Sequence, residues 1–444
     1  MKPVKIGLLG LGTVGRGTAQ ILQRNAGELE RRCGRQIVIH SAAVRNASKA
    51  VADEMGIRNT SDGAALVADP EIDIVCEMMG GDHPALEWVL SAIKHGKHVI
   101  TANKALIAVH GNQIFEAARK VGVVVAFEPA VAGGIPVIKA LREGLAANQI
   151  QWVAGIINGT GNFILSEMAS KGREFSDVLQ EAQELGYAEA DPTFDVEGID
   201  AAHKLTIMAS IAFGIPLQFD RVFTEGISKI SREDVSYAEE LGYRIKHLGI
   251  AKKTDKGIEL RVHPTLIPHQ RLIANVNGVM NAVLVRGDAV GPTMYYGPGA
   301  GAEPTGSAVV ADIVDVVRVL DAAPVNQVPQ LAFQAEALAD LPILEPVDFE
   351  SAYYLRVHAE DKPGVMASIT GIFGKLGISI EAIVQKEPSP GEGVSAQPDA
   401  TIIVPVILLT RLVREGLMLE AIVDIEKLDS VTQSVAMLRV EALN

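Results

Sequence analysis

The sequence predicts a mixed α/β protein built from several domains. Apolar strand-like runs alternate with helices through the first 130 residues, which is the pattern of a parallel sheet covered on both faces. Longer helices then mix with strands, as in an α+β domain, and the last part of the chain has the order βαββαβ. With 444 residues, the chain has room for about two to four domains and a sizeable core.

The first domain is expected to span residues 1–130. Its predicted strands are Val4–Leu9, Ile37–Val44, Ile72–Glu77, His98–Thr101 and Val123–Glu128, and its predicted helices are Val14–Arg24, Pro84–His95 and Ile114–Val121. The amphipathic segment Ser307–Leu320 predicts one more helix, near residues 306–320, that returns to pack on this domain.

The second domain is expected over residues 131–305, with strands Gln151–Ile157 and Ile258–His263 and a long helix at Ile199–Phe213. Residues 321–347 contain four prolines and little regular pattern, which predicts a linker.

The third domain is expected over residues 348–444. Its predicted strands are Ser351–His358, Ile378–Lys386, Thr401–Leu409 and Gln433–Val440, with a helix after Asp361-Lys-Pro-Gly364 and another at Leu412–Lys427. The stretch EPSPGEGVSAQPDA, residues 387–400, predicts a mobile hairpin loop.

The composition excludes some classes of partner. A net charge of −14 argues against nonspecific binding to nucleic acid or an anionic membrane, although backbone N–H groups could still hold an anionic cofactor. The two cysteines form no CxxC pair, and no apolar stretch is long enough for a signal peptide core or a membrane span. We therefore expect a cytoplasmic protein.

A glycine-rich turn marks a nucleotide site. Gly10, Gly12 and Gly15 form GxGxxG directly between the first strand and the first helix. The first glycine permits the tight turn, the second lets the backbone approach a pyrophosphate, and the third permits close helix packing. Together with Thr13 and Val14, these residues predict a Rossmann-type domain that binds a dinucleotide at the helix N-terminus.

The residues after the second strand bear on the choice of dinucleotide. A carboxylate there would accept from the ribose 2′-hydroxyl of NAD, but the chain has Arg45 and Asn46, with Lys49 nearby. Arg45 and Lys49 favour the 2′-phosphate of NADP, with NAD as the alternative. Both cations could equally be solvated surface residues.

The segment from Leu185 to Lys204 is rich in carboxylates. They are Glu189, Asp191, Asp195, Glu197 and Asp200. Asp200 and Lys204 are spaced i, i+4 and share one face of a predicted helix that is otherwise apolar. Such a pair is costly to bury unless it has a function, but by itself it is also explained as a routine helical ion pair beside a solvated acidic loop.

This segment and several other motifs closely resemble the homoserine dehydrogenase family. The resembling motifs cover roughly the first 320 residues, in the family's order. They are GLGTVG, Ala102-Asn103-Lys104, Glu128-Pro-Ala-Val-Ala-Gly-Gly-Ile-Pro136, Asn158-Gly-Thr160, the segment 185–204 and Gly299-Ala-Gly-Ala-Glu-Pro-Thr305.

The resemblance implies reversible NAD(P)H-dependent reduction of L-aspartate 4-semialdehyde to L-homoserine, in the biosynthesis of threonine, methionine and isoleucine. It implies Lys204 as proton donor, with Lys104 and Asp200 at the reacting centre. The implied substrate ligands are Glu189, Asp195, Asp200, Gly159 and Thr160, and the implied cofactor contacts include Asn103, Lys104, Gly186, Gly301 and Glu303.

These residue types suit that chemistry. Negative charge builds on the carbonyl oxygen as hydride arrives, and an ammonium group can stabilise it and supply a proton. A second lysine nearby makes proton release easier by repulsion. The α-ammonium of the substrate needs carboxylates such as Glu189 and Asp195.

The resemblance also implies a monovalent cation, usually sodium, at the turn after Glu128. The implied ligands are mainly backbone carbonyls, at Glu128, Val131, Gly133 and Ile135. The alternative is a plain interdomain turn in which Glu128 caps exposed N–H groups.

The third domain resembles ACT domains, through the βαββαβ order and Asp361-Lys-Pro-Gly364. The resemblance implies amino-acid binding at paired domains, and a free sheet edge favours a homodimer or homotetramer. Threonine, a downstream product, is the expected effector. Deletion from about residue 345 is expected to leave an active, threonine-insensitive enzyme, whereas a purely structural dimerisation module is the alternative.

Two other functions stay open at this point. One is another ACT-linked dehydrogenase, such as a phosphoglycerate dehydrogenase, which would need a catalytic histidine paired with a carboxylate. The other is a catalytically silent amino-acid sensor that binds a dinucleotide. Lys104 and Lys204 argue against both, and no kinase domain is evident.

Overall fold

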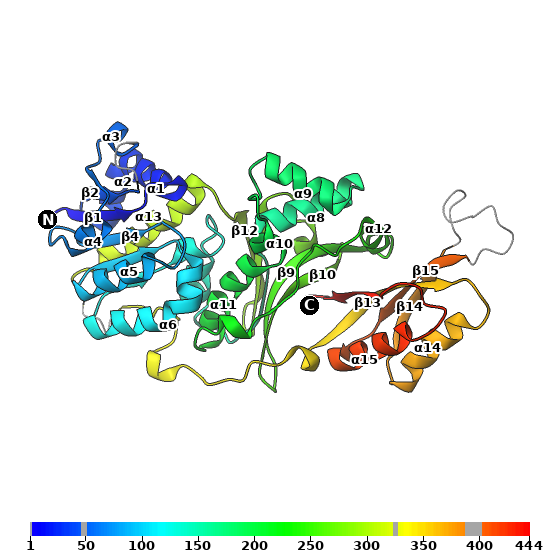
Figure 1. Ribbon diagram of the computed structural model, residues 1–444. Helices are drawn as coiled ribbons and strands as arrows, with labels where there is room; N and C mark the ends of the chain where they lie inside the picture. The colour runs from blue at the N-terminus through cyan, green and yellow to red at the C-terminus, as the bar shows by residue number, and fades with distance from the viewer. Residues whose placement is uncertain (1, 46–50, 323–326, 387–401) are drawn as a thin grey trace.

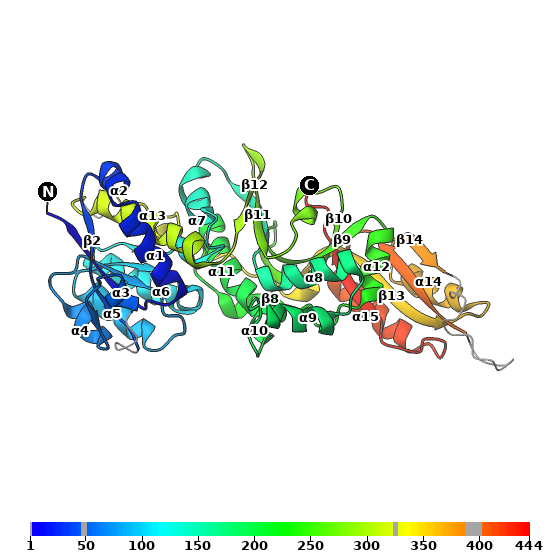
Figure 2. The same cartoon turned by 90° about the horizontal axis from the view of Figure 1, so that it is seen from above.

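The computed structural model describes residues 2–45, 51–322, 327–386 and 402–444. The three parts of the chain lie in a row, with the N-terminal domain at one end and the C-terminal domain at the other (Figures 1 and 2). Lys49 and the predicted loop at 387–400 lie outside the described residues. No helix in the described part combines the length and apolarity needed to cross a membrane.

The N-terminal domain is a six-stranded parallel sheet in the order β3-β2-β1-β4-β5-β6. Helices α1, α2 and α13 cover one face and α4, α5 and α6 cover the other. The strands are β1 Val4–Leu9, β2 Ile37–Ala43, β3 Asn59–Thr60, β4 Ile74–Glu77, β5 His98–Thr101 and β6 Val125–Ala126. The helices are α1 Thr13–Arg24, α2 Ala26–Cys33, α3 Val51–Glu54, α4 Gly63–Ala68, α5 Ala85–Lys94, α6 Lys104–Val121 and α13 Ala302–Val319.

Two predicted boundaries here are wrong in ways that matter for the site. Helix α6 begins at Lys104 rather than Ile114, because the Asn103 side chain caps it by accepting from Leu106 N at 3.1 Å. The last strand is only Val125–Ala126, since the chain turns into a 3-10 helix at Glu128. The return helix α13 is confirmed and packs along α1.

The middle of the chain forms a sheet with helices on one face (Figure 2). Its strands are β7 Ile150–Ile156, β8 Phe223–Thr224, β9 Tyr243–Lys253, β10 Ile258–Pro268, β11 Met280–Gly287 and β12 Gly291–Pro298. Its helices are α7 Val137–Lys139, α8 Gly159–Lys171, α9 Phe175–Glu184, α10 Thr193–Val196, α11 Ile199–Phe213 and α12 Arg232–Glu240. Helix α11 is buried almost throughout and has the predicted bounds.

The C-terminal domain has the predicted βαββαβ order. Its elements are β13 Glu350–Glu360, α14 Val365–Lys375, β14 Ile380–Gln385, β15 Ile403–Thr410, the short β16 Val413–Arg414, α15 Glu415–Glu426 and β17 Ala436–Val440. The two helices pack on one face of the antiparallel sheet β17-β13-β15-β14.

This sheet is not a separate unit, which the sequence did not indicate. Strand β17 pairs in parallel with β10, so the middle and C-terminal sheets form one continuous path of strands. The helix-free face of the C-terminal sheet packs against α8 and α12 through a shared apolar cluster. The β17 edge of the C-terminal sheet is therefore used within the chain, which leaves β14 as the other edge strand among the described residues.

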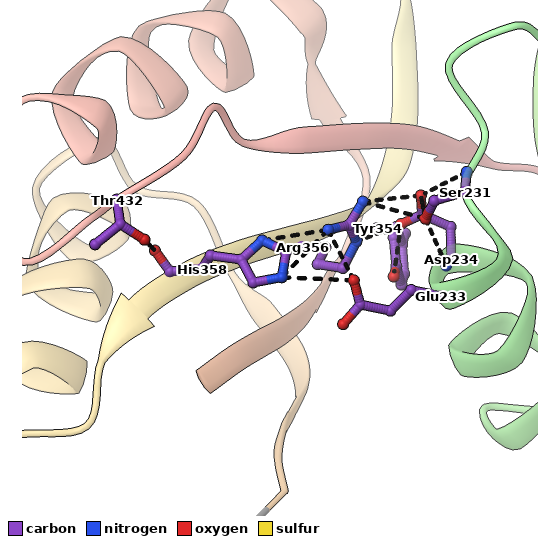
Figure 3. A network of polar contacts seen from close by, with 7 residues as sticks. All are labelled: Ser231, Glu233, Asp234, Tyr354, Arg356, His358 and Thr432. Atoms are coloured by element: carbon purple, nitrogen blue, oxygen red, sulfur yellow. Dashed lines mark hydrogen bonds and ion pairs between the residues drawn. The ribbon is translucent and has the colours of Figure 1, made fainter. Parts of the chain in front are cut away.

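A polar network reinforces this contact (Figure 3). Arg356 of β13 donates to both oxygens of Asp234, at 2.7 and 3.0 Å, and Tyr354 donates to the same carboxylate. Asp234 is also the N3 residue of the capping box that starts α12, with Ser231 as N-cap. The C-terminal domain thus holds the start of a helix of the middle domain.

Candidate active site

The glycine-rich turn has the geometry that the motif requires. Gly10 adopts a left-handed conformation, with φ of 95°, and a Cβ on Gly15 would overlap the Gly10 carbonyl. Helix α1 starts without a side-chain cap, so its first N–H groups are free to bind an anion. These features fit the pyrophosphate of a dinucleotide.

A cavity of about 470 Å³ continues from this turn across the end of β2. Gly10 and Gly12 lie at one side of it, and the side chains of Arg16 and Arg45 line it as well. Sequence analysis identified Arg45 but missed Arg16, because Arg16 is brought to the end of β2 only by the packing of α1 on the sheet. Two cations at this position suit an anionic group.

A second cavity, of about 580 Å³, lies between the N-terminal and middle domains. It gathers ten of the predicted site residues, which come from six separate stretches of chain. They are Val14, Lys104, Gly133, Gly159, Thr160, Gly186, Asp195, Asp200, Lys204 and Gly301.

At its centre, two lysines bind one carboxylate. Lys204 Nζ donates to Asp200 Oδ2 at 2.7 Å and to the Ile157 carbonyl at 2.7 Å. Lys104 Nζ lies 3.1 Å from the other oxygen, Asp200 Oδ1. Asn158, which caps α8, donates to Asp200 at 2.9 Å and to Asp195 at 2.7 Å. The i, i+4 pair of the sequence is therefore part of a larger network, not a solvated helical pair.

The electrostatics of this network separate the roles of its members. Burial would raise the pKa of Asp200, but Lys204 and Lys104 lower it below its usual range, so the group is a carboxylate. Burial, reinforced by Lys104, lowers the pKa of Lys204 although Asp200 opposes the shift. The lowered pKa makes Lys204 a better proton donor than an ordinary lysine. Burial also raises the pKa of Asp195.

Residues around the network shape the cavity. Thr160 Oγ1 donates to the Tyr187 carbonyl at 2.7 Å, which joins α8 to the loop that carries Gly186. A Cβ on Gly159 would lie 2.8 Å from the Val279 carbonyl, so only glycine fits there without a shift. Asn158 and Asn281 also line the cavity. Sequence analysis gave no role to either, although Asn158 opens one of the motifs.

Several predicted site residues line neither cavity: Thr13, Gly15, Asn103, Glu128, Val131, Ile135, Glu189 and Glu303. Glu189 is exposed. Glu303, in the first turn of α13, forms an ion pair with Arg24 at 2.8 Å on the surface. Asn103 is buried. Its side-chain oxygen caps α6, and its side-chain nitrogen donates to the Gly81 carbonyl at 2.7 Å.

The turn after Glu128 is buried and tightly wound, with left-handed conformations at Ala132 and Gly133. The Glu128 carboxylate accepts from the N–H groups of Ile138 and Lys139, at 2.9 and 2.8 Å. Burial and the nearby Asp312 raise the pKa of Glu128 to about 7. Two of the predicted carbonyl ligands already accept backbone hydrogen bonds. The Ile135 carbonyl accepts from Val137 N at 2.7 Å, and the Glu128 carbonyl accepts from Val131 N at 3.4 Å.

His203, which precedes Lys204 on α11, lies between two aromatic rings. His203 is stacked between Phe194 and Phe219, with ring centroids 5.6 and 4.1 Å away. Burial and Lys104 lower its pKa to about 4, so the ring is neutral. A dinucleotide-binding domain joined to this lysine–carboxylate cavity defines a nicotinamide-dependent oxidoreductase.

Comparisons with known proteins identify the family. Residues 136–314 match the homoserine dehydrogenase model, residues 10–128 its NAD-binding domain and residues 353–425 the ACT domain. The chain is 62% identical to the homoserine dehydrogenase of Pseudomonas aeruginosa and 54% identical to that of Neisseria gonorrhoeae, each over the full length of both chains. A crystal structure of the enzyme from Thiobacillus denitrificans, 61% identical, superposes with a TM-score of 0.94 over 100% of this chain and 99% of that one. The chain belongs to the homoserine dehydrogenase family.

Proposed function

We propose that the larger cavity reduces the aldehyde of L-aspartate 4-semialdehyde, with Lys204 as the proton donor. The observation that carries this proposal is the Lys204 ammonium held by Asp200 and by the Ile157 carbonyl, with Lys104 on the opposite oxygen of the same carboxylate. A bound reduced nicotinamide supplies the hydride. Lys204 stabilises the negative charge that develops on the substrate oxygen and then protonates it.

The other polar groups would position the substrate. Asp195 lies beside Asp200 through their shared partner Asn158, and its carboxylate suits the substrate ammonium. Gly159 and Thr160 contribute the start of α8 to the same wall. The role of Glu189 rests on the family motif alone.

The direct test is NADPH oxidation in the presence of L-aspartate 4-semialdehyde. Lys204→Ala should lower turnover by orders of magnitude while NADPH affinity is retained, because the lysine acts on the substrate oxygen. Lys171→Ala, which removes an exposed lysine at the end of α8, serves as the matched control. Turnover of Lys204→Ala close to that of the control would remove Lys204 from this role.

We also propose that NADP is preferred over NAD. The support is the pair Arg16 and Arg45 at the end of β2, and a solved homoserine dehydrogenase from a hyperthermophilic archaeon, 27% identical with a TM-score of 0.61, is in complex with NADPH. Arg45→Asp should raise the Kd for NADPH while sparing NADH. Equal weakening of both would count against a role for Arg45 in choosing the cofactor.

Regulation and cation binding complete the proposal. The ACT match supports control by an end-product amino acid, with threonine as the candidate, and the oligomer would be a homodimer or homotetramer. The turn at Glu128, Val131, Gly133 and Ile135 is the proposed sodium site. Activity that is unchanged when choline replaces sodium would argue against the sodium site. Activity that is unchanged when threonine is added would argue against control by threonine.

A further inference from the structure

One polar side chain in the larger cavity has no assigned role. Asn281 is 1% exposed, and its Oδ1 has no hydrogen-bond partner among the described residues. It lies on β11 with the same alternation as Val283 and Val285, which pack in the core cluster that includes α11. Asn281 therefore faces the side of the sheet that carries Lys204.

An unpartnered buried amide oxygen is unusual, because it loses its hydrogen bonds to water without replacing them. The position is also sterically enforced. A Cβ on Gly299 would overlap the Asn281 amide, so the backbone of the glycine-rich loop before α13 lies directly against it. An amide that is kept free here, at the wall of the cavity, is explained if a ligand supplies its partner.

The surroundings indicate which part of a ligand reaches it. Small residues form this side of the cavity. They are Ala130, Ala132, Gly133, Gly299, Ala300 and Gly301. Side chains of this size leave flat, mostly apolar space, which suits an aromatic ring. The substrate ammonium is instead served by the carboxylates Asp195 and Asp200, which come from other stretches of chain.

We propose that Asn281 binds the carboxamide of the nicotinamide ring. A carboxamide offers one donor group and one acceptor, which are complementary to those of an asparagine side chain. The ring carbon that transfers hydride is adjacent to the carbon that bears the carboxamide, so this contact would fix the position of the reacting carbon relative to Lys204. The inference rests on the proposed placement of the nicotinamide beside Lys204.

Binding of a cofactor analogue tests the contact without turnover. The 3-acetylpyridine analogue of NADP carries a methyl group in place of the amide nitrogen and cannot donate to Asn281 Oδ1. Measured by calorimetry, the wild-type enzyme should bind the analogue roughly tenfold more weakly than NADP. A tenfold change in affinity corresponds to the loss of about one hydrogen bond. Asn281→Leu should bind both at the weaker affinity, so that the ratio falls to about one.

A matched control separates this result from a general loss of structure. Asn148→Leu makes the same substitution near the other end of β11, where the Asn148 side chain accepts from Val290 N. It should retain the wild-type ratio. If Asn281→Leu fails to fold, as judged by thermal unfolding, Asn281→Ala provides the same comparison, because alanine also removes the acceptor.

The inference would be overturned if wild type bound the analogue and NADP equally well, or if Asn281→Leu kept the wild-type ratio of the two affinities. It would also be overturned if Asn281→Leu changed only the KM for the aldehyde, which would assign Asn281 to the substrate. Failure of the proposed function is distinguishable. It would show as a normal binding ratio in an enzyme that does not reduce L-aspartate 4-semialdehyde.

Discussion

At the scale of single residues, the site depends on the interaction of three charged side chains, Asp200, Lys204 and Lys104, in the larger cavity. Burial disfavours the charged forms of both Asp200 and Lys204, but each side chain stabilises the charge of the other. Lys104 on the far oxygen of Asp200 shifts this balance, since it lowers the pKa of both neighbours. The result is a largely buried lysine whose pKa is lowered, so that it releases a proton more easily than an ordinary lysine.

The first prediction follows from these shifts. In the proposed reaction Lys204 must be protonated, so kcat/KM should fall as pH rises through its pKa, which lies below the ordinary lysine value of 10.5. Because Asp200 raises the pKa of Lys204, Asp200→Asn should move this alkaline limb to lower pH. A pH profile of kcat/KM measures both. An unmoved limb in Asp200→Asn would mean that another group is titrating.

At the scale of elements, the close contact of α1 with α13 connects two parts of the cofactor site. A Cβ on Gly17 would overlap the Ala302 carbonyl, and one on Gly306 would lie 2.7 Å from Thr18 N. Glycine at both positions lets the two helices approach closely. Helix α1 starts at the GxGxxG turn and α13 starts just after Gly301, so their packing sets the distance between both glycine-rich segments.

Gly17→Ala should therefore push α13 away from α1. We expect a loss of about 1–3 kcal/mol in the free energy of unfolding, as for overpacked cores, together with a higher Kd for NADPH. Denaturant unfolding and a binding titration measure the two effects. Gly27→Ala in α2 is the control, because nothing lies within 4 Å of its added Cβ and stability should be equal or higher. Similar behaviour of the two variants would contradict the packing argument.

At the scale of the whole molecule, the C-terminal domain is joined to the middle domain by buried polar contacts. Arg261 of β10 is fully buried and donates to Glu441 at 2.7 Å and to Ser351 at 3.0 Å, both beyond the linker. Arg439 of β17 donates to Glu225 of the middle domain at 2.7 Å. Removing residues beyond about 345 would leave Arg261 and Asp234 buried without these partners. A loss of folding, rather than simple insensitivity to threonine, is expected from that deletion.

A point variant tests this coupling more cleanly. Arg356→Met leaves Asp234 without its main partner in a site that is 2% exposed, so the free energy of unfolding should fall by roughly 3 kcal/mol. Lys362→Met removes an ion pair within the C-terminal domain whose lysine side chain is 55% exposed, and should change little. Chemical denaturation compares them. Equal stability of the two variants would show that the interface contributes no more than a surface pair.

Local pattern was enough for much of the fold and of the site. The strand, glycine turn and helix around Gly10 are contiguous in sequence, and the spacing of Asp200 and Lys204 places both on one face of α11 without any distant contact. Such features depend on backbone geometry over a few residues. The family motifs added Lys104, Gly159, Thr160 and Gly186, and all four line the larger cavity.

Contacts between distant segments were decided by packing alone. Lys104 reaches Asp200 because α6 packs on α11, Arg16 reaches the end of β2, and Asn281 lies against Gly299. The pairing of β17 with β10 joins segments more than 170 residues apart, as Thr265 and Leu266 meet Arg439 and Val440. A sequence pattern shows which face of an element is apolar, but not which other element will cover it. For this reason the sequence determined the elements, the glycine turn and the pairing of Asp200 with Lys204 on one helix face, whereas the tertiary structure alone decided how the domains join and what surrounds Lys204.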